Sequence, residues 1–507
     1  MKTDMMRHIL TKAGAWLPAA VAMVLAGCGA PKVPEGNVEQ SESAAVVVPD
    51  YTGVTIPPNI APLNFEIDMP GDEYVVRVSG AGGASLTEEG KTIEWDPEGW
   101  RNLLAASKGG DLDYEVYVRQ GERWTCHKFS NHVAPEEIDR YLSYRLIEPS
   151  FEQYSALSLN QRDLTTFDET VIWNNPSPCD ERRGYCINCH VPRNQYKDRT
   201  SLFHVRGNSG GTIIMTGGKI EKVDLKTDST LTAGVYPSWH PTLDLIAFST
   251  NETIQTFPGK GSQRVEVLDK ASDLILYDVA RHEVSNISAD PQLLETYPCW
   301  SADGKRLYYS VGRYPEGVTG ENIHDHWGEM RYDIVGRDFD MTGRRFSEAD
   351  TVVCASGEGK SALLPRISPD GRYLLYCKAP FGSFHIWHKD SDLHIVDLRS
   401  GADRELANAN SGEAESYHSW SSESRWIVFS SRRDDGSYTR PYIAYIDGNG
   451  CDRKAFVVPQ KSPRHYDEQM KSYNVPEFMS EPFAFSRSDI LPSIRSGAET
   501  VAFKPGK

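Results

Sequence analysis

The sequence contains no basic tract and has a deficit of positive charge. Its 54 Lys and Arg residues stand against 71 Asp and Glu residues, which gives a formal net charge of −17 over 507 residues. An acidic surface of this size repels nucleic acid, so we expect no nucleic-acid partner. The chain also lacks an apolar run long enough for a comfortable membrane span, since the one near the N-terminus covers only residues 13–25.

What the sequence does contain favours β-structure. Tyr (24), Trp (11), Gly (41) and Pro (30) are all plentiful, and this composition is typical of strands joined by many tight turns. A chain of this length is also too long for a single hydrophobic core, so two or three domains are expected.

The N-terminus reads as an export signal. A basic segment precedes the apolar run, and the run ends in Leu-Ala-Gly-Cys28, which resembles the bacterial lipobox. The resemblance implies that residues 1–27 are a lipoprotein signal peptide and that Cys28 carries the lipid. The alternative is an ordinary secretory signal with a chance cysteine. Gly29 in place of Asp implies the outer membrane, so we expect a lipid-anchored, periplasm-facing protein of the cell envelope.

Composition divides the rest of the chain into four parts. Residues 28–54 are rich in Pro, Glu, Ser and Ala and predict a flexible tether. Residues 55–150 hold short alternating runs between turns, which predict a fibronectin-III-like β-sandwich. Residues 151–206 are rich in Pro and Cys and predict an irregular connector. Residues 207–507 contain an internal repeat and end in a C-terminal tail.

The repeat places Trp239, Trp300, Ile367 and Trp420 before similar strands, at spacings of 61, 67 and 53 residues. Each unit predicts a small antiparallel sheet that cannot bury both faces alone, whereas several such sheets around an axis can. The Trp-Ser-x-Asp-Gly pattern resembles the repeat of TolB-type β-propellers. We therefore expect a mainly β fold: a sandwich, a Cys-rich connector and a propeller of five or six blades, which a tail strand closes.

The stretch Cys186-Ile-Asn-Cys189-His190 is the one strong chemical motif. CxxCH is the attachment motif of c-type cytochromes, in which both thiols form thioethers with haem and the His is the proximal iron ligand. The export signal supplies the compartment in which such haem is attached. We therefore expect covalent haem c on Cys186 and Cys189, with His190 bound to iron.

Three other interpretations of the motif stay open. Cys179, Cys186 and Cys189 with His190 or His204 have the ligand types of a zinc site. A thioredoxin-type redox pair would need a surrounding βαβ pattern, which the sequence lacks. A structural disulfide is the third alternative.

The sequence offers two main candidates for the sixth iron ligand. His204 follows His190 by fourteen residues and Met215 follows it by twenty-five. We favour His204 as the distal ligand, because Met215 lies in an expected strand. Ligation by two His side chains would give a lower reduction potential than His with Met. Three basic residues could pair with the haem propionates: Arg193, Lys197 and Arg206.

The stretch Gly207-Asn-Ser209-Gly-Gly211 matches G-x-S-x-G, but propeller repeats follow it rather than the α/β-hydrolase domain that this motif requires. We therefore predict no catalytic residues and an electron carrier or binding protein rather than a hydrolase.

Taken together, the chain resembles a group of exported, propeller-bearing proteins from Bacteroidetes-like bacteria, labelled cytochrome c biosynthesis or TolB-like proteins. The matching stretches are residues 56–65, CxxCH with the Phe-His that follows it, and the Trp/Asp-Gly repeats. The resemblance implies electron transfer by one haem, with the propeller as a docking platform for a redox or envelope protein. The alternative is a non-redox periplasmic binding or scaffold module, in which CxxCH is a zinc site or a disulfide.

Overall fold

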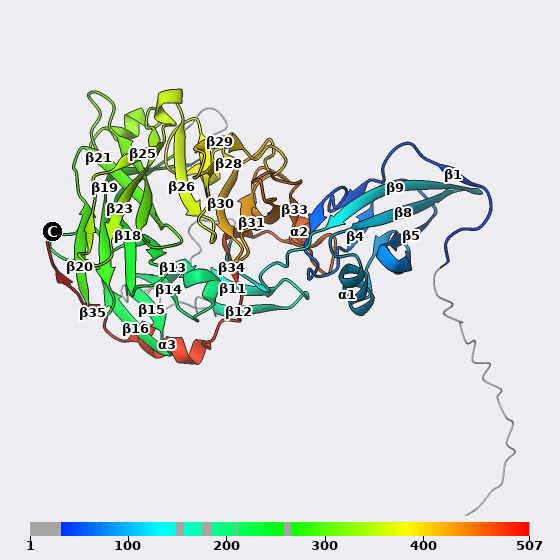
Figure 1. The fold of residues 1–507 in the computed structure, drawn as a ribbon, viewed down its shortest axis with the longest axis horizontal. Coiled ribbons are helices and arrows are strands. Elements are labelled where there is room, and N and C mark those ends of the chain that lie inside the picture. The colour runs from blue at the N-terminus through cyan, green and yellow to red at the C-terminus, as the bar shows by residue number, and fades with distance from the viewer. Residues whose placement is uncertain (1–31, 149–156, 175–184, 208–209, 258–264, 506–507) are drawn as a thin grey trace, which may run out of the picture.

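The protein was analysed as a computed structural model that describes residues 32–148, 157–174, 185–207, 210–257 and 265–505, with only the backbone described at 185 and 186. It has two lobes, a smaller one from the N-terminal part of the chain and a larger one from the rest (Figure 1). The mainly β fold class predicted from the sequence is confirmed. Among the described residues, no helix is long and apolar enough to cross a membrane.

The smaller lobe contains two sheets and one helix. One sheet has the order β1-β9-β8-β5-β6, with β3 beside β9, and the other has the order β2-β4-β7. The elements of this lobe are β1 (Val38–Gln40), β2 (Val47–Val48), β3 (Thr55–Ile56), β4 (Phe65–Ile67), β5 (Glu73–Ser79), β6 (Ser85–Glu89), β7 (Thr92–Ile93), α1 (Pro97–Ala106), β8 (Asp111–Gln120) and β9 (Arg123–Val133).

Helix α1 begins where its sequence specifies. The Asp96 side chain accepts a hydrogen bond from the Gly99 amide, and Pro97 occupies the first helical position. Trp100, Leu103 and Leu104 share one face of the helix and are buried against the sheets.

The described part of the expected tether, residues 28–54, is folded. Strand β1 pairs in parallel with β9, and the side chains of Val47 and Tyr51 are buried in the core. Composition suggested a linker because the segment is polar overall. Several of its few apolar side chains nevertheless lie at positions that the fold buries.

The larger lobe contains six groups of four strands, each of which forms a small antiparallel sheet. Strand β19 also pairs with β21 of the next group, and short strands extend the edges of three groups, so the hydrogen-bonded sheets are not all separate. Five follow the chain in order, and the sixth combines β10, β11 and β12 with β34 from near the C-terminus. By sheet, from the innermost strand outward, the strands are β34 (Ser472–Met479), β10 (Tyr141–Ile147), β11 (Ser158–Asp163), β12 (Glu169–Asn174); β13 (Tyr185–Pro192), β14 (Ser201–Gly207), β15 (Gly211–Thr216), β16 (Lys219–Asp224); β17 (Val235–Trp239), β18 (Leu245–Thr256), β19 (Glu266–Asp278), β20 (Glu283–Ser288); β21 (Leu293–Trp300), β22 (Arg306–Arg313), β23 (Tyr332–Asp340), β25 (Asp350–Val353); β26 (Ser361–Ile367), β27 (Tyr373–Ala379), β28 (Asp392–Asp397), β29 (Ala402–Glu405); and β30 (Glu415–Trp420), β31 (Trp426–Ser431), β32 (Arg440–Tyr445), β33 (Phe456–Val457).

The six innermost strands form a ring. Each contacts the next in the order β13, β17, β21, β26, β30 and β34, and β34 contacts β13. The lobe is therefore a six-bladed propeller whose closing blade joins the two ends of the repeat region. The remaining elements are β24 (Arg345–Phe346), α2 (His465–Glu468), α3 (Arg487–Arg495), β35 (Glu499–Thr500) and β36 (Ala502–Phe503).

The expected connector, residues 151–206, differs most from the structure. Its described residues supply β11 and β12 to the closing blade and β13 and β14 to the next one. In addition, β10 belongs to the propeller, although the sandwich was expected to extend to residue 150. The polar, irregular sequence concealed these strands. Most of them pair with strands that adjoin them in the chain, and of these described strands only β10 has a distant partner, β34.

The Ser-x-Asp-Gly turns have the role that the repeat predicts. The Asp303 carboxylate accepts hydrogen bonds from Ser301 Oγ (2.7 Å) and the Lys305 amide (3.1 Å), and Gly304 supplies a positive φ of 70°. The indole of Trp420 donates to the Arg366 carbonyl of the preceding blade at 3.1 Å. These turns and Trp side chains fix neighbouring blades in register.

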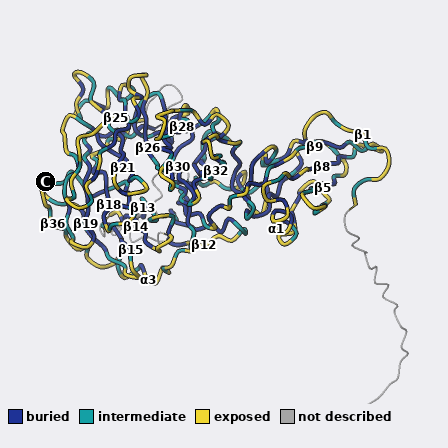
Figure 2. Tube along the Cα trace, viewed as in Figure 1, coloured by how far each residue is buried: buried dark blue, intermediate teal, exposed yellow. Residues whose placement is uncertain are grey.

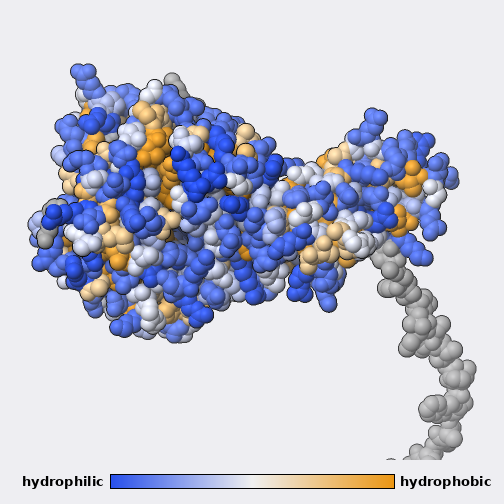
Figure 3. Space-filling view, in the orientation of Figure 1, coloured by the Kyte–Doolittle hydropathy of each residue, from blue (hydrophilic) through white to orange (hydrophobic). Residues whose placement is uncertain are grey.

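The two lobes are in direct contact. The Glu136 carbonyl accepts from the Trp426 indole (3.1 Å), and the Ser422 amide donates to the Asp139 carboxylate (2.7 Å). One continuous hydrophobic core includes side chains of both lobes, in agreement with the buried segments in Figure 2. The visible outer surface is mostly hydrophilic (Figure 3).

Candidate functional site

Each innermost strand has an irregular position at which its pairing with the next strand shifts register. At that position one non-glycine residue has a positive φ, a conformation that such residues rarely adopt. The six residues are Cys189 (50°), Tyr236 (48°), Tyr297 (54°), Leu364 (58°), Tyr417 (47°) and Val475 (51°). We call them the axial belt, because all six line the same central cavity.

The axial cavity has a volume of about 840 Å³, within the range of roughly 300–1,000 Å³ of small-molecule sites. Its wall combines aromatic and aliphatic side chains with four Arg side chains and one described acidic residue, Glu148. The four are Arg145, Arg206, Arg366 and Arg432. A cavity of this charge in a protein of net charge −17 favours an anionic ligand with a large apolar surface.

Strand β13 places the CxxCH motif at this cavity. Cys189 and His190 both line it, and Cys189 takes the belt position that Tyr or aliphatic residues occupy in the other blades. The side chain of Cys186 lies outside the described residues. Cys186 lies three residues before the belt residue of its blade, and the residues at that position in two other blades, Ala233 and Ser472, line the cavity.

The imidazole of His190 is 3% exposed, and neither ring nitrogen makes a hydrogen bond within the described structure. The Ser143 backbone lies near the ring but outside hydrogen-bond geometry. Burial, followed by the charge of Arg145, lowers the pKa of His190 to about 3. His190 is therefore neutral at pH 7, the state in which imidazole ligates a metal.

One other blade has a His directly after its belt residue. His418 follows Tyr417, and its ring donates to the Leu375 carbonyl of the preceding blade at 3.2 Å and lies 3.5 Å from Cys377 Sγ. In the four remaining blades this position is Pro. A His here can therefore serve the fold alone, and what distinguishes His190 is its lack of a hydrogen bond.

Neither expected distal ligand lines the axial cavity. His204 is 5% exposed, its Nδ1 is 2.8 Å from Thr212 Oγ1, and its ring packs against Phe248 of the next blade. Met215 is fully buried in the core between β15 and its neighbours. Among the described residues, the cavity wall contains no His besides His190 and no Met, and its oxygen-bearing aromatic groups are four Tyr side chains.

Of the basic residues suggested for the propionates, only Arg206 lines the axial cavity. Arg193 lies beside a second cavity of about 120 Å³, where it forms ion pairs with Asp198 and Asp244. Residues of all six innermost strands line this second cavity, so the two cavities lie on one axis. Arg366 lines both cavities and pairs with Glu477 at 3.1 Å between them.

The structure bears on the alternative interpretations of the motif only in part. No group of three or more His, Cys, Asp or Glu side chains that could hold a metal occurs among the described residues. The described cysteines are free thiols: Cys126, Cys189, Cys299, Cys354, Cys377 and Cys451. Cys28, Cys179, Ser209 and the side chain of Cys186 lie outside the described residues.

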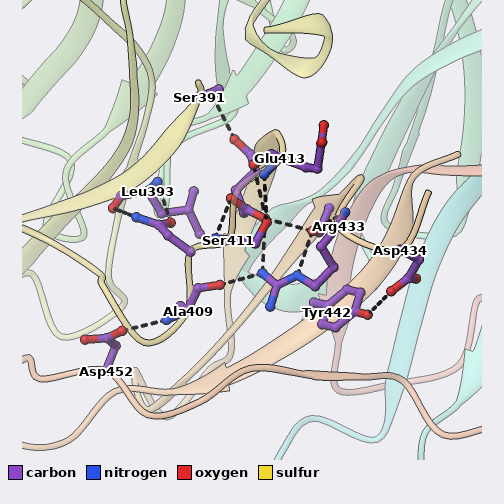
Figure 4. Close-up of polar contacts among 12 residues, drawn as sticks. Ser391, Leu393, Ala409, Ser411, Glu413, Arg433, Asp434, Tyr442 and Asp452 are labelled. Atoms are coloured by element: carbon purple, nitrogen blue, oxygen red, sulfur yellow. Dashed lines mark hydrogen bonds and ion pairs between the residues drawn. The ribbon is translucent and has the colours of Figure 1, made fainter. Parts of the chain in front are cut away.

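Buried carboxyl groups two residues before the belt were not predicted. Glu415 accepts hydrogen bonds from Ser411 Oγ (2.7 Å) and Ser431 Oγ (2.8 Å) and pairs with Arg433 at 3.1 Å. Figure 4 shows this network around Ser411 and Arg433. The matching Glu295 has a pKa raised to about 7, mainly by burial. The repeated Glu-(Thr/Ser)-Tyr triplet could have revealed both residues.

The fold and site define a class: a six-bladed β-propeller with a basic, aromatic axial cavity. No protein-family model matches the sequence, and no curated protein matches it. TolB from Acinetobacter baumannii is a similar solved structure, with 13% identity over 76% of this chain and 85% of that chain and a TM-score of 0.42. A putative TolB from Agrobacterium tumefaciens has 14% identity over 68% of this chain and 99% of that chain, with a TM-score of 0.36. Prolyl oligopeptidase B from Galerina marginata has 10% identity over 68% of this chain and 42% of that chain, with a TM-score of 0.35. These similarities concern the fold alone.

Proposed function

We propose that this chain is a lipid-anchored redox protein of the cell envelope that carries one covalent c-type haem in the axial cavity. The observation that carries the proposal is that Cys189 and His190, the second half of the CxxCH motif, line that cavity together. When bound, haem would supply reversible one-electron chemistry. The propeller would then hold the haem and present a surface to a redox partner.

The residues of the cavity fit this group in three respects. The buried His190 ring offers two nitrogens without hydrogen bonds, and a buried polar group of this kind is costly unless something binds it. The aromatic and aliphatic belt suits a flat, apolar macrocycle. The arginines suit its ionised propionates.

The distal ligand remains a separate question. Ligation by His204, the expectation from the sequence, would require its ring to leave Thr212 and the blade interface and enter the axial cavity, so we propose a haem that His204 does not ligate. Met215 would have to leave a hydrophobic core.

The deciding experiment is to purify the protein from an envelope in which haem-attachment machinery operates. The proposal expects a covalent pyridine-haemochrome spectrum and a mass increase of one haem. Cys189→Ala should lose normal two-thioether attachment, while the matched control Cys354→Ala, an exposed thiol on another blade, should retain it. A wild-type protein without covalent porphyrin would refute the proposal.

A second function is favoured by the charge of the cavity itself. In this reading the propeller is a non-redox binding or scaffold module, and the four arginines receive an anionic group from a ligand or partner. CxxCH would then be a zinc site or a disulfide. A colourless, zinc-loaded wild-type protein would support this function over the redox one.

Membrane attachment follows from the lipobox resemblance. Two or more buried acyl chains anchor a protein stably, at about 0.8 kcal/mol for each buried CH₂ group. Cys28→Ser should therefore release the protein from the membrane fraction into the soluble fraction of fractionated cells. Continued membrane retention of this variant would contradict lipidation at Cys28.

A further inference from the structure

The four arginines of the axial cavity lie on two different sides of it. In the ring of innermost strands, β26 is three blades away from β13 in either direction. The wall formed by β26 therefore faces the wall that carries the CxxCH motif.

Two arginines belong to the CxxCH side. Arg206, on β14, is paired in register with Cys186, and Arg145, on β10, belongs to the adjoining closing blade. The other two belong to the far side. Arg366 lies on β26 itself, and Arg432 directly follows β31 in the next blade.

The geometry of c-type haem determines which of these two pairs of arginines can reach the propionates. The two vinyl groups that become thioethers and the two propionates lie at opposite edges of the macrocycle. With both sulfur atoms on β13, the propionates must extend towards the far wall. We infer that Arg366 and Arg432 receive the two propionates and that Arg145 and Arg206 do not. This inference rests on the proposed function.

The positions of these residues along the axis agree with the inference. Cys186 and Cys189 lie three residues apart on β13, so the two attachment points differ in height. The Arg432 amide donates to the carbonyl of Ala414 (3.0 Å), which lies three residues before the belt residue Tyr417, as Cys186 lies three before Cys189. Arg366 lies two residues beyond the belt, at the end of the cavity nearer Cys189. One arginine thus lies at each height.

Both guanidinium groups are already held in place. Arg432 stacks on the Trp387 ring at 3.7 Å, and its Nε donates to the Ile386 carbonyl at 2.7 Å. Arg366 is oriented by Glu477. Charged donors fixed in this way lose little side-chain freedom when they bind a carboxylate.

The test uses holoprotein made with the attachment machinery and compares Arg366→Gln and Arg432→Gln with the matched control Arg206→Gln. The first two variants should shift the propionate-bending bands in resonance Raman spectra. They should also lower the midpoint potential, because a positive charge near the haem favours its reduced form. The control removes a positive charge near the haem as well, so it should also lower the midpoint potential but should leave the propionate-bending bands unchanged. Bands that shift in Arg206→Gln and not in the two far-wall variants would overturn the inference.

A binding measurement separates propionate recognition from a structural effect. The variant Cys186→Ala/Cys189→Ala should bind haemin more tightly than haemin dimethyl ester, which lacks the acidic groups. Adding Arg432→Gln should reduce that preference by about tenfold or more, whereas adding Arg206→Gln should leave it unchanged. An unchanged preference with Arg432→Gln would overturn the inference. Wild-type protein without covalent haem would overturn both the inference and the proposed function, while propionate bands that respond to Arg206→Gln alone would overturn only the inference.

Discussion

Strands β13 and β30 occupy equivalent places in two blades, and they differ in the residues that matter most. Both have a belt residue with positive φ followed by a His: Cys189-His190 in β13 and Tyr417-His418 in β30. The His418 ring donates a hydrogen bond to the Leu375 carbonyl of the preceding blade. The His190 ring lies near the Ser143 backbone of its own preceding blade but forms no hydrogen bond within the described structure. The comparison shows that the fold accounts for a His at this position but not for a thiol beside it or an unsatisfied ring.

The largest effect is expected when the belt residue of β13 is replaced by the Tyr that β30 has at this position. Cys189→Tyr should leave the propeller folded, because Tyr occupies the belt in three other blades, and should abolish normal two-thioether attachment. Circular dichroism would check the fold, and mass spectrometry together with the pyridine-haemochrome spectrum would check attachment. Normal two-thioether attachment in this variant would contradict the role of Cys189.

The next test concerns the residue two positions before the belt, which is Glu in β21 and β30 but Ile187 in β13. Burial raises the pKa of Glu295 to about 7 from its usual value of 4.5. Between these two pH values the folded state holds a proton that the unfolded state releases. The wild type should therefore lose stability as pH rises from 4.5 to 7, by about 1.4 kcal/mol per pH unit for this group.

Glu295→Gln should remove that loss. Urea unfolding at pH 5 and pH 7.5 should show that the variant gains stability relative to wild type at the higher pH. An equal difference between variant and wild type at both pH values would show that Glu295 is ionised when folded.

A smaller effect is expected when the two His residues are compared directly. His418→Leu leaves the Leu375 carbonyl without its donor and should lower the free energy of unfolding by about 1–3 kcal/mol. His190→Leu removes no hydrogen bond and should cost the haem-free protein less, while changing the spectrum of the holoprotein. Equal losses in urea unfolding of the haem-free variants would give His190 the same structural role as His418.

The smallest effect is expected at His204. Because its ring lies between two blades and not in the axial cavity, His204→Gln should leave the Soret band of the holoprotein unchanged. A shift of that band, with the fold intact by circular dichroism, would identify His204 as an iron ligand after all.

The sequence allowed the repeat blades to be predicted because each has its own local signal, a Trp or Ile followed by a polar turn and an apolar strand. In two of the four units, after Trp300 and Ile367, the turn contains Asp-Gly. The same reasoning failed for residues 151–206, although the tail strand that was expected to close the ring is present as β34. Strands β10 to β12 pair with one another locally, but their innermost partner, β34, comes more than 300 residues later. Local periodicity carries no information about such a partner.

For the site, the chemical motif was visible and its surroundings were not. CxxCH predicted which residues matter, but sequence spacing suggested that a polar loop would carry them and that His204 would face the iron. Pairing of Asn188 with His204 in adjacent strands makes the intervening segment a hairpin in a blade. The axial belt was hidden for a further reason: its residue types differ, and only their shared backbone conformation relates them.

The pairing of β10 with β34 also has a consequence for the order in which the ring assembles. The blade that closes the ring adjoins β13, so the wall beside Cys189 cannot form until β34, near the end of the chain, is present. Until then CxxCH belongs to an open ring. If the proposed function holds, an attachment enzyme and a bulky porphyrin would reach the motif most easily in that interval, before folding is complete.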